Sequence, residues 1–308
     1  MKIILSKFIA LGLLLSIGIG VKAQRNPFQS IYFQNPYLYN PALAGINPGL
    51  VINTAYRQQS SNFPGTPKTG TLTADLSAGK VGLGITINDE QMGLIRQTRV
   101  MGSYAYHLQL SDYNQRLSFG LSLGLDDSRV SNSSVNGDLT DEEIAIYNQL
   151  KPYVDGDFGA AYTSNDFNAA VAIPNLKSSF FKTSDYRYDS GRLLFAAMAS
   201  YKVQLQNEDA SFVLEPLAGF RVVKGFNDIV DVGFNFTLNN YGLYFQSIYH
   251  TSQSLGLGFG LDQHTYAFNF AYNLETGLLN NYTQGAFELG IKLRLFQKSK
   301  SKTILLPR

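Results

Sequence analysis

Long runs of alternating residues limit the fold of this chain more than any other feature. In residues 80–88, Val81 and Leu83 alternate with Gly82 and Gly84, so that one face is apolar and the other is small. Successive side chains of a β-strand point to opposite sides, whereas a helix repeats about every 3.6 residues. The pattern therefore predicts strands, and the same alternation returns along the rest of the chain.

We predict fourteen strands whose connections are alternately short and long. The second, fourth, sixth, eighth, tenth and twelfth connections are tight turns, whereas most of the others are long, as at 58–68, 126–155, 174–190 and 274–284. The predicted strands cover residues 50–57, 69–77, 80–88, 95–110, 115–125, 156–163, 167–173, 191–206, 211–224, 228–238, 241–249, 254–261, 264–273 and 285–296. Outer-membrane barrels have short periplasmic turns and long outer loops. The asymmetry therefore predicts an all-β fold, an antiparallel transmembrane β-barrel.

The length and the second face of the strands support a membrane position. Many strands have about nine residues or more, the length that a tilted strand needs to cross a bilayer, whereas soluble strands centre on about five or six. Gly and Ser on the second face suit a crowded barrel interior, and Glu288, Lys292 and Arg294 are predicted to face inward. Pro216 predicts a bulge or a split in its strand. A soluble exported sandwich is the alternative fold, because it would show the same alternation.

Composition agrees with a barrel and excludes several kinds of site. The chain has 19 Tyr, 21 Phe, 28 Gly and no Trp, and charged residues make up 16%, against about 25% in a typical soluble domain. Without cysteine, the protein has no disulfide, no thiolate metal site and no cysteine for a lipid anchor.

Residues 1–23 are predicted to be an export signal that is cleaved near Ala23. Two lysines precede an apolar run from Phe8 to Ile19, which is too short to cross a bilayer, although a retained anchor is the alternative. Cleavage removes three lysines and no acid, so the formal charge changes from +2 to −1. A nearly neutral chain argues against nucleic acid as a partner.

The segment after the signal is rich in Asn-Pro pairs. Four pairs lie within residues 26–48, with aromatic residues between them, and no other Asn-Pro pair occurs in the chain. Proline fixes its own φ and holds the preceding residue extended, and Asn starts turns. We expect residues 24–49 to form an ordered periplasmic arm or plug, inside the barrel or against a periplasmic partner. A flexible linker is the alternative.

The remaining domain boundaries follow from the strands. Residues 50–297 are predicted to form the barrel, and residues 298–308 a basic C-terminal tail. The tail is either solvated or a contact for an acidic periplasmic partner.

Patterns for catalysis, metal binding or cofactor binding are weak in this chain. His107, His250 and His264 fall in or beside different strands without a metal-binding spacing, and the glycines of "GLGFG" (256–260) lie inside a strand with no helix after them. Thr140 and Glu143 predict a capped helix start in the longest loop, rather than a calcium site. We therefore predict no enzyme activity, no catalytic residue, no metal and no cofactor.

The segment "YFQNPYLYNPALAG" (32–45) strongly resembles the N-terminal signature of the PorP/SprF family of the Bacteroidetes type IX secretion system. Tyr39-Asn40-Pro41-Ala42 and Ala44-Gly45 match that signature residue by residue. "KVGLGITINDEQMG" (80–93) and "FELGIKLRLF" (287–296) resemble the third and the closing strand of the family. The resemblance runs from residue 28 to 296.

The resemblance implies an outer-membrane component of the secretion and gliding machinery that anchors or assists the export of a partner surface protein. The implied partners are outer-membrane lipid, type IX secretion components on the periplasmic side, and a secreted adhesin or cargo protein on the outer side. An outer-membrane channel for small solutes is the alternative. The candidate partner-binding residues are Tyr32, Phe33, Asn35, Pro36, Tyr37, Tyr39, Asn40, Pro41 and Gly45.

Overall fold

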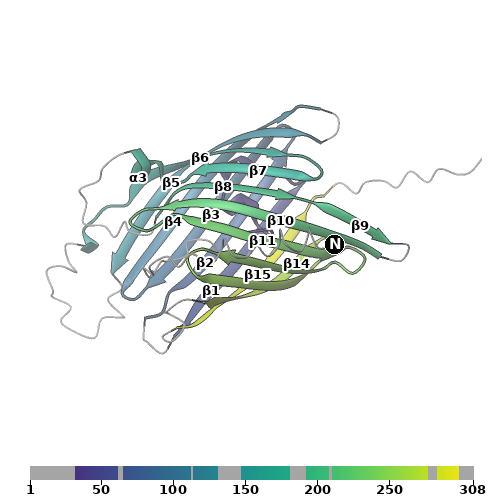
Figure 1. The fold of residues 1–308 in the computed structure, drawn as a ribbon. Coiled ribbons are helices and arrows are strands. Elements are labelled where there is room, and N and C mark those ends of the chain that lie inside the picture. The colour runs from purple at the N-terminus through teal and green to yellow at the C-terminus, as the bar shows by residue number, and fades with distance from the viewer. Residues whose placement is uncertain are drawn as a thin grey trace, which may run out of the picture.

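The computed structural model describes residues 32–61, 65–111, 114–130, 147–180, 192–207, 210–276 and 283–297. In these ranges fifteen strands form one antiparallel sheet (Figure 1). The strands are β1 (Leu50–Ser61), β2 (Lys68–Ala78), β3 (Val81–Met92), β4 (Ile95–Gln109), β5 (Arg116–Val130), β6 (Tyr153–Thr163), β7 (Phe167–Ile173), β8 (Leu193–Tyr201), β9 (Val203–Asn207), β10 (Ala210–Val223), β11 (Ile229–Leu238), β12 (Leu243–His250), β13 (Ser254–Asp262), β14 (Tyr266–Glu275) and β15 (Thr283–Leu295).

The sheet closes on itself as a barrel. Apart from β8 and β9, each strand pairs with its neighbours in chain order, and β15 returns to β1 with Leu295 opposite Leu50. Both β8 and β9 pair with β10 and are separated only by Lys202, so they are two parts of one strand. The predicted fold, an antiparallel barrel of fourteen strands, is therefore confirmed.

The break between β8 and β9 has its cause in β10. The register of β10 is the same against both parts, and it places Pro216 opposite Tyr201. Proline has no backbone N–H, so one bond of the ladder is missing at this point. Pro216 therefore produces the predicted split, and the unchanged register excludes a bulge.

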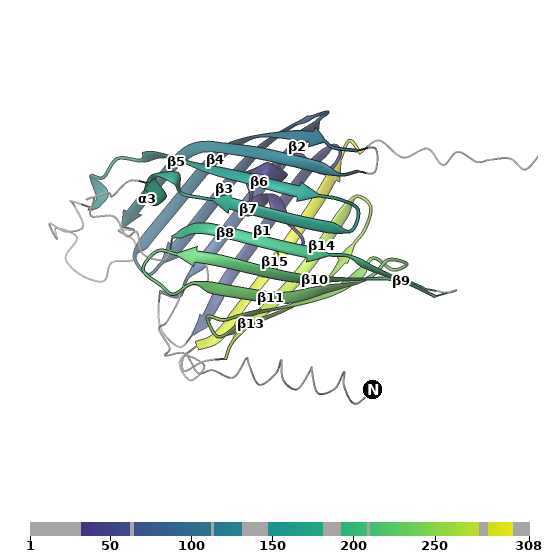
Figure 2. The same cartoon turned by 45° about the horizontal axis from the view of Figure 1, so that its top comes forward.

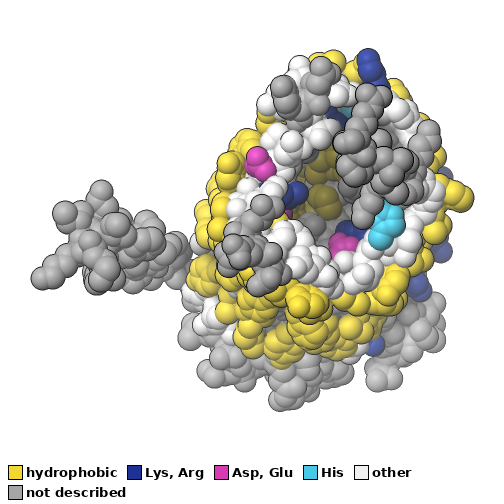
Figure 3. Space-filling model, turned by 90° about the vertical axis from the view of Figure 1, so that its right-hand side faces the viewer, with side chains coloured by type: hydrophobic (Ala, Val, Ile, Leu, Met, Phe, Trp, Pro, Cys, Tyr) yellow, Lys and Arg dark blue, Asp and Glu magenta, His cyan; other side chains and the backbone are white. Residues whose placement is uncertain are grey.

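The two faces of the wall have opposite character. Outward side chains are large and apolar, as at Leu83 and Leu123, which are 46% and 67% exposed. Inward side chains are polar and buried, as at Thr73 and Asp126. Figure 3, which looks into one mouth, shows hydrophobic side chains over the outer wall and charged side chains within the hollow. The barrel is thus apolar toward lipid and polar inside.

The two ends of the barrel differ, and we name them by their connections. The turn end carries the turns at 79–80, 164–166, 239–242 and 263–265, and the loop end carries the long connections 131–152 and 174–192. A short helix, α3 (Leu176–Phe180), lies at the loop end (Figures 1 and 2).

Several predicted loops were too long. The predicted loop 126–155 begins with the end of β5 and finishes in β6, the loop 58–68 shrinks to 62–67, and Gly93 and Leu94 alone connect β3 to β4. The strands continue into the predicted loops because polar residues of neighbouring strands pair with one another there. For example, Arg96 of β4 lies opposite Gln91 of β3. The asymmetry between the two ends is therefore smaller than predicted, and it rests mainly on two connections.

In the part of the chain that the structure describes, no helix is long and apolar enough to cross a membrane. The predicted signal, the helix start at Thr140 and Glu143, and the basic tail lie outside the described residues.

Candidate functional site

The Asn-Pro arm folds into two successive turns. Each proline starts a 3₁₀ helix, η1 (Pro36–Leu38) and η2 (Pro41–Leu43), where its fixed φ and missing N–H fit the first position. The side chain of Asn40 caps η2 by accepting a hydrogen bond from the N–H of Ala42 at 2.9 Å. The sequence pattern thus determines the local shape of the arm.

The arm lies against the inner wall of the barrel. The Asn35 amide donates to the Thr73 hydroxyl of β2 at 3.0 Å, and the Tyr37 hydroxyl donates to Ser103 of β4 at 2.8 Å. Burial raises the pKa of Tyr37 above its usual range, so its phenol remains a donor.

Asn40 and the end of the arm make further contacts with the wall. The Asn40 amide donates to the carbonyl oxygens of Ala160 in β6 at 3.2 Å and Val171 in β7 at 2.9 Å. The backbone N–H of Gly45 donates to the Asp75 carboxylate at 2.9 Å. The arm is therefore attached to strands on different sides of the lumen.

His107 of β4 joins the arm to β5. Its Nε2 lies 2.9 Å from the carbonyl oxygen of Ala44, and its Nδ1 lies 2.8 Å from the Ser118 hydroxyl. A carbonyl only accepts, so Nε2 carries the proton and Nδ1 accepts from Ser118. His107 is thus a lumen side chain with a structural partner on each ring nitrogen.

Inward-facing glycines make room for the arm. A Cβ on Gly120 would lie 2.3 Å from the backbone of Pro41 and Ala42, and a Cβ on Gly82 would lie 1.8 Å from the Ala44 carbonyl oxygen. A Cβ on Gly84 would likewise overlap the Tyr37 side chain, and a Cβ on Gly159 would overlap the Asn40 side chain. These close approaches explain several glycines that the sequence placed on the polar face.

The aromatic side chains of the arm bury themselves on one wall. Tyr32, Phe33 and Tyr39 pack against an apolar patch on the inner face of β8, β10 and β12, which contains Ala196, Met198, Leu217 and Ile248. The rings of Tyr32 and Tyr39 lie 5.2 Å apart. The apolar patch in an otherwise polar lumen therefore buries the aromatic side chains of the arm.

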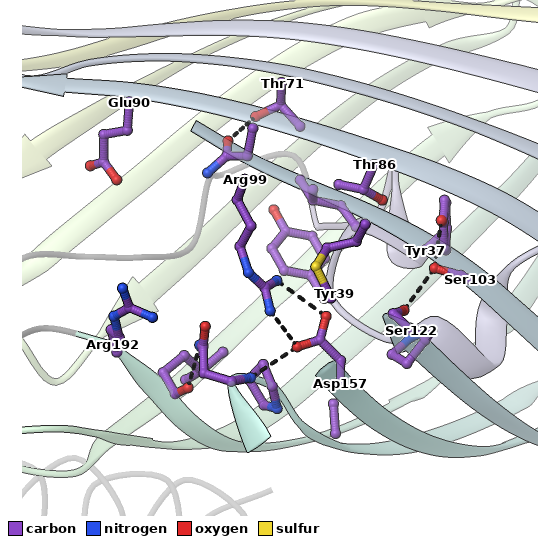
Figure 4. Close-up of a pocket in the computed structure, with 18 of the residues that line it drawn as sticks. Tyr37, Tyr39, Thr71, Thr86, Glu90, Arg99, Ser103, Ser122, Asp157 and Arg192 are labelled. Atoms are coloured by element: carbon purple, nitrogen blue, oxygen red, sulfur yellow. Dashed lines mark hydrogen bonds and ion pairs between the residues drawn. The ribbon is translucent and has the colours of Figure 1, made fainter. Parts of the chain in front are cut away.

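A cavity of about 220 Å³ lies between the arm and the loop end. Tyr37 and Tyr39 line its floor, and charged side chains line its walls (Figure 4). Arg99 of β4 crosses to Asp157 of β6 with a bidentate pair at 2.8 and 3.2 Å. Arg192 forms an ion pair with Asp126 at 3.3 Å.

A second group of buried charges lies near the loop end of β10, β11 and β12. Arg221 makes a bidentate pair with Asp231 at 2.5 and 2.6 Å, and His250 Nδ1 lies 2.5 Å from the same carboxylate. These ion pairs join β4 to β6 and β10 to β11 on the inner face of the barrel.

All the candidate partner-binding residues lie in this arm, and the structure brings them together on the inner wall. Asn35, Tyr37 and Asn40 are at most 5% exposed, Pro41 and Gly45 are buried, and the others are half-buried. Whether they bind a partner stays a prediction. Arg99, Arg192 and their acidic partners were not predicted from the sequence, although the place of Arg99, Asp126 and Asp157 on the second face of strands was the available signal.

Comparison with known proteins identifies the family. The family model described as "Type IX secretion system membrane protein PorP/SprF" matches residues 21–293. The chain belongs to the PorP/SprF family. The family places this PorP/SprF member in the outer membrane as a component of type IX secretion, as the Asn-Pro signature predicted. A search among curated proteins gave no match.

Solved structures similar to this PorP/SprF member are outer-membrane barrels. The toluene transporter TbuX of Ralstonia pickettii has a TM-score of 0.50 and 12% identity, covering 89% of this chain and 96% of that one. CdiB of Acinetobacter baumannii has a TM-score of 0.45 and 10% identity, and the match covers 80% of this chain and 60% of CdiB. Omp33 of Acinetobacter baumannii has a TM-score of 0.45 and 9% identity, and the match covers 81% of this chain and 99% of Omp33. At such identities the likeness concerns the fold alone.

Proposed function

We propose that this PorP/SprF member is a non-enzymatic anchor that holds or assists the export of a partner surface protein in type IX secretion. The occupied lumen is the observation that carries the proposal. An arm that is hydrogen-bonded to β2, β4, β6 and β7 inside the lumen obstructs passage along the barrel axis. A protein that works by binding, unlike a solute channel, does not need that passage.

The two ends of the barrel suit different partners in this proposal. The turn end faces the periplasm, where the arm joins β1 and where secretion components bind. The loop end faces outward, where the connections 131–152 and 174–192 and the polar cavity meet the cargo or adhesin. Signal cleavage near Ala23 leaves the arm at the start of the mature chain. In this arrangement the arm closes the periplasmic mouth and offers its exposed residues Asn47 and Pro48 as a docking surface.

A solute channel is the second candidate, because the lumen is polar and hollowed at its mouth (Figure 3). Conductance in planar bilayers separates the two functions. The anchor proposal expects a closed purified barrel that copurifies with secretion components. Steady conductance of the intact barrel would favour the channel.

Deletion of residues 26–46 tests the anchor directly. We expect the variant to reach the outer membrane but to lose surface display of the partner protein or retention of secretion components. Heat-modifiable migration on gels checks that the barrel is folded. Unchanged display and unchanged retention in a folded variant would contradict the role of the arm.

A further inference from the structure

The barrel wall has an open strand edge at the turn end, formed by β9. The turn at 164–166 ends the β6–β7 hairpin, whereas the adjacent strand continues past Tyr201 as β9. The N–H of Lys202 donates to the Asp166 carbonyl oxygen at 2.6 Å, and among the described residues β9 itself pairs with β10 alone. Five residues add about 16 Å of strand, and β9 projects beyond the neighbouring turns in both views (Figures 1 and 2).

The hydrogen-bond pattern shows which backbone groups point to the open side. The Ser211 carbonyl oxygen accepts from the N–H of Asn239, on the β11 side of β10. Ser211 and its partner Gln206 are therefore a non-hydrogen-bonded pair, and the alternation of an antiparallel ladder makes Gln204 the next residue of this kind. The backbone N–H and C=O groups of Gln204 and Gln206 thus point away from β10, on the same side as the N–H of Lys202.

The edge lacks the features that normally block strand pairing. Natural edge strands carry charges, prolines or bulges that discourage another strand from adding. The sequence Val203-Gln204-Leu205-Gln206-Asn207 has no charged residue and no proline, and its register with β10 is regular. Val203 and Leu205 are 37% and 48% exposed on the outward face. The edge is therefore shaped to accept a strand.

The neighbouring strands extend this exposed apolar face. Leu205 lies opposite Phe212, and Val203 lies opposite Leu214. Phe212 stacks on Phe236 of β11 with ring centroids 5.7 Å apart. An incoming strand that alternates apolar and polar residues would continue the apolar face on one side and meet Gln204 on the other.

We propose that the β9 edge binds an extended strand of a periplasmic protein of the secretion apparatus by strand addition. The inference rests on the proposed function, which places the turn end in the periplasm. Main-chain bonds to Gln204 and Gln206 supply the attachment, and the bound segment alternates apolar and uncharged polar residues.

A second copy of this chain does not fit the edge as well. Two barrels inserted in one membrane have the same orientation, so their β9 strands run in the same direction. Antiparallel pairing between them, which every other pair in the sheet uses, would require one barrel to be inverted.

The variant Gln204→Pro tests the edge. Proline removes the N–H that points to the open side while leaving the bonds of Val203 and Leu205 to β10, and edge strands tolerate proline there. Gln204→Thr is the control, because it changes the side chain and keeps the N–H. Each full-length protein is isolated in detergent from its native cells, and the retained periplasmic secretion components are quantified. We expect Gln204→Pro to lower their retention about tenfold or more and Gln204→Thr to leave it unchanged.

Amide hydrogen exchange of the wild-type protein provides a second measurement that needs no variant. The amides of residues 204 and 206 should exchange rapidly in the isolated barrel and slowly in the complex with secretion components. Rapid exchange in the complex, or full retention by folded Gln204→Pro, overturns the strand addition while leaving the anchor function intact. Crosslinking of β9 to a second copy overturns the choice of partner. Failure of the wild-type protein to retain any secretion component contradicts the proposed function itself.

Discussion

Asn40 holds the arm through three hydrogen bonds, one that caps η2 and two that reach the carbonyl oxygens of Ala160 and Val171. Asn40→Ala removes all three, and we expect the arm to lose about 1–3 kcal/mol of attachment to the wall. Limited proteolysis of the folded barrel in detergent measures this as faster cleavage within the arm. Asn47→Ala is the matched control, since Asn47 also precedes a proline but is exposed. Equal cleavage rates for the two variants would contradict the role of Asn40.

Gly120 allows the arm to approach the wall. A Cβ at Gly120 would lie 2.3 Å from the arm backbone, whereas the nearest atom to a Cβ at Gly102 is 3.9 Å away. Gly120→Ala therefore forces the arm or the strand to move, and overpacking of this kind costs about 1–3 kcal/mol. Urea unfolding of the detergent-solubilised barrel should show a lower midpoint for Gly120→Ala and little change for Gly102→Ala. The same midpoint for both would mean that the arm does not lie on Gly120.

At the level of strands, the alternation of side chains was a reliable guide wherever lipid faces one side. The segment 167–173 was predicted with its observed bounds, and β4 within one residue of its end. The predicted ends failed where both faces become polar, as in Asp89, Glu90 and Gln91, because the alternation that marks a lipid-facing strand disappears there. Cross-strand contacts such as the ion pair of Arg96 with Asp89 at 2.9 Å extend these strands instead.

Pro216 leaves one backbone hydrogen bond missing between β10 and the strand formed by β8 and β9. Pro216→Val supplies the missing N–H opposite Tyr201, so we expect β8 and β9 to join into one continuous strand. One added ladder bond contributes about 0.5–1.5 kcal/mol. A higher urea midpoint and slower amide exchange near residue 216 would measure the gain. A midpoint that stays the same or falls would mean that the break between β8 and β9 is not due to the missing N–H.

For the whole molecule, the sequence required the aromatic residues of the arm to be buried but did not say where. Burial inside the barrel and burial against a partner both satisfied that requirement. The choice depends on long-range matches that a single sequence does not reveal: glycines opposite η2, Thr73 opposite Asn35, and an apolar inner patch near Tyr32. The buried ion pairs were missed for the same reason, since Arg99 and Asp157 meet across 58 residues of sequence.

These matches make the arm a fixed part of the barrel. Withdrawal would leave buried groups such as Asp75 and His107 without their partners in the arm, and each buried group left unsatisfied costs about 1–3 kcal/mol. The chain has no cysteine, so a pair introduced as Asn35→Cys and Thr73→Cys can be joined selectively by a short bifunctional thiol reagent. The native side-chain atoms at these positions lie 3.0 Å apart. We expect the pair to crosslink in folded protein and the crosslinked protein to display its partner as well as the unlinked one does, with each single cysteine variant as the control. Loss of display only after crosslinking would show that the arm must leave the lumen for the protein to work.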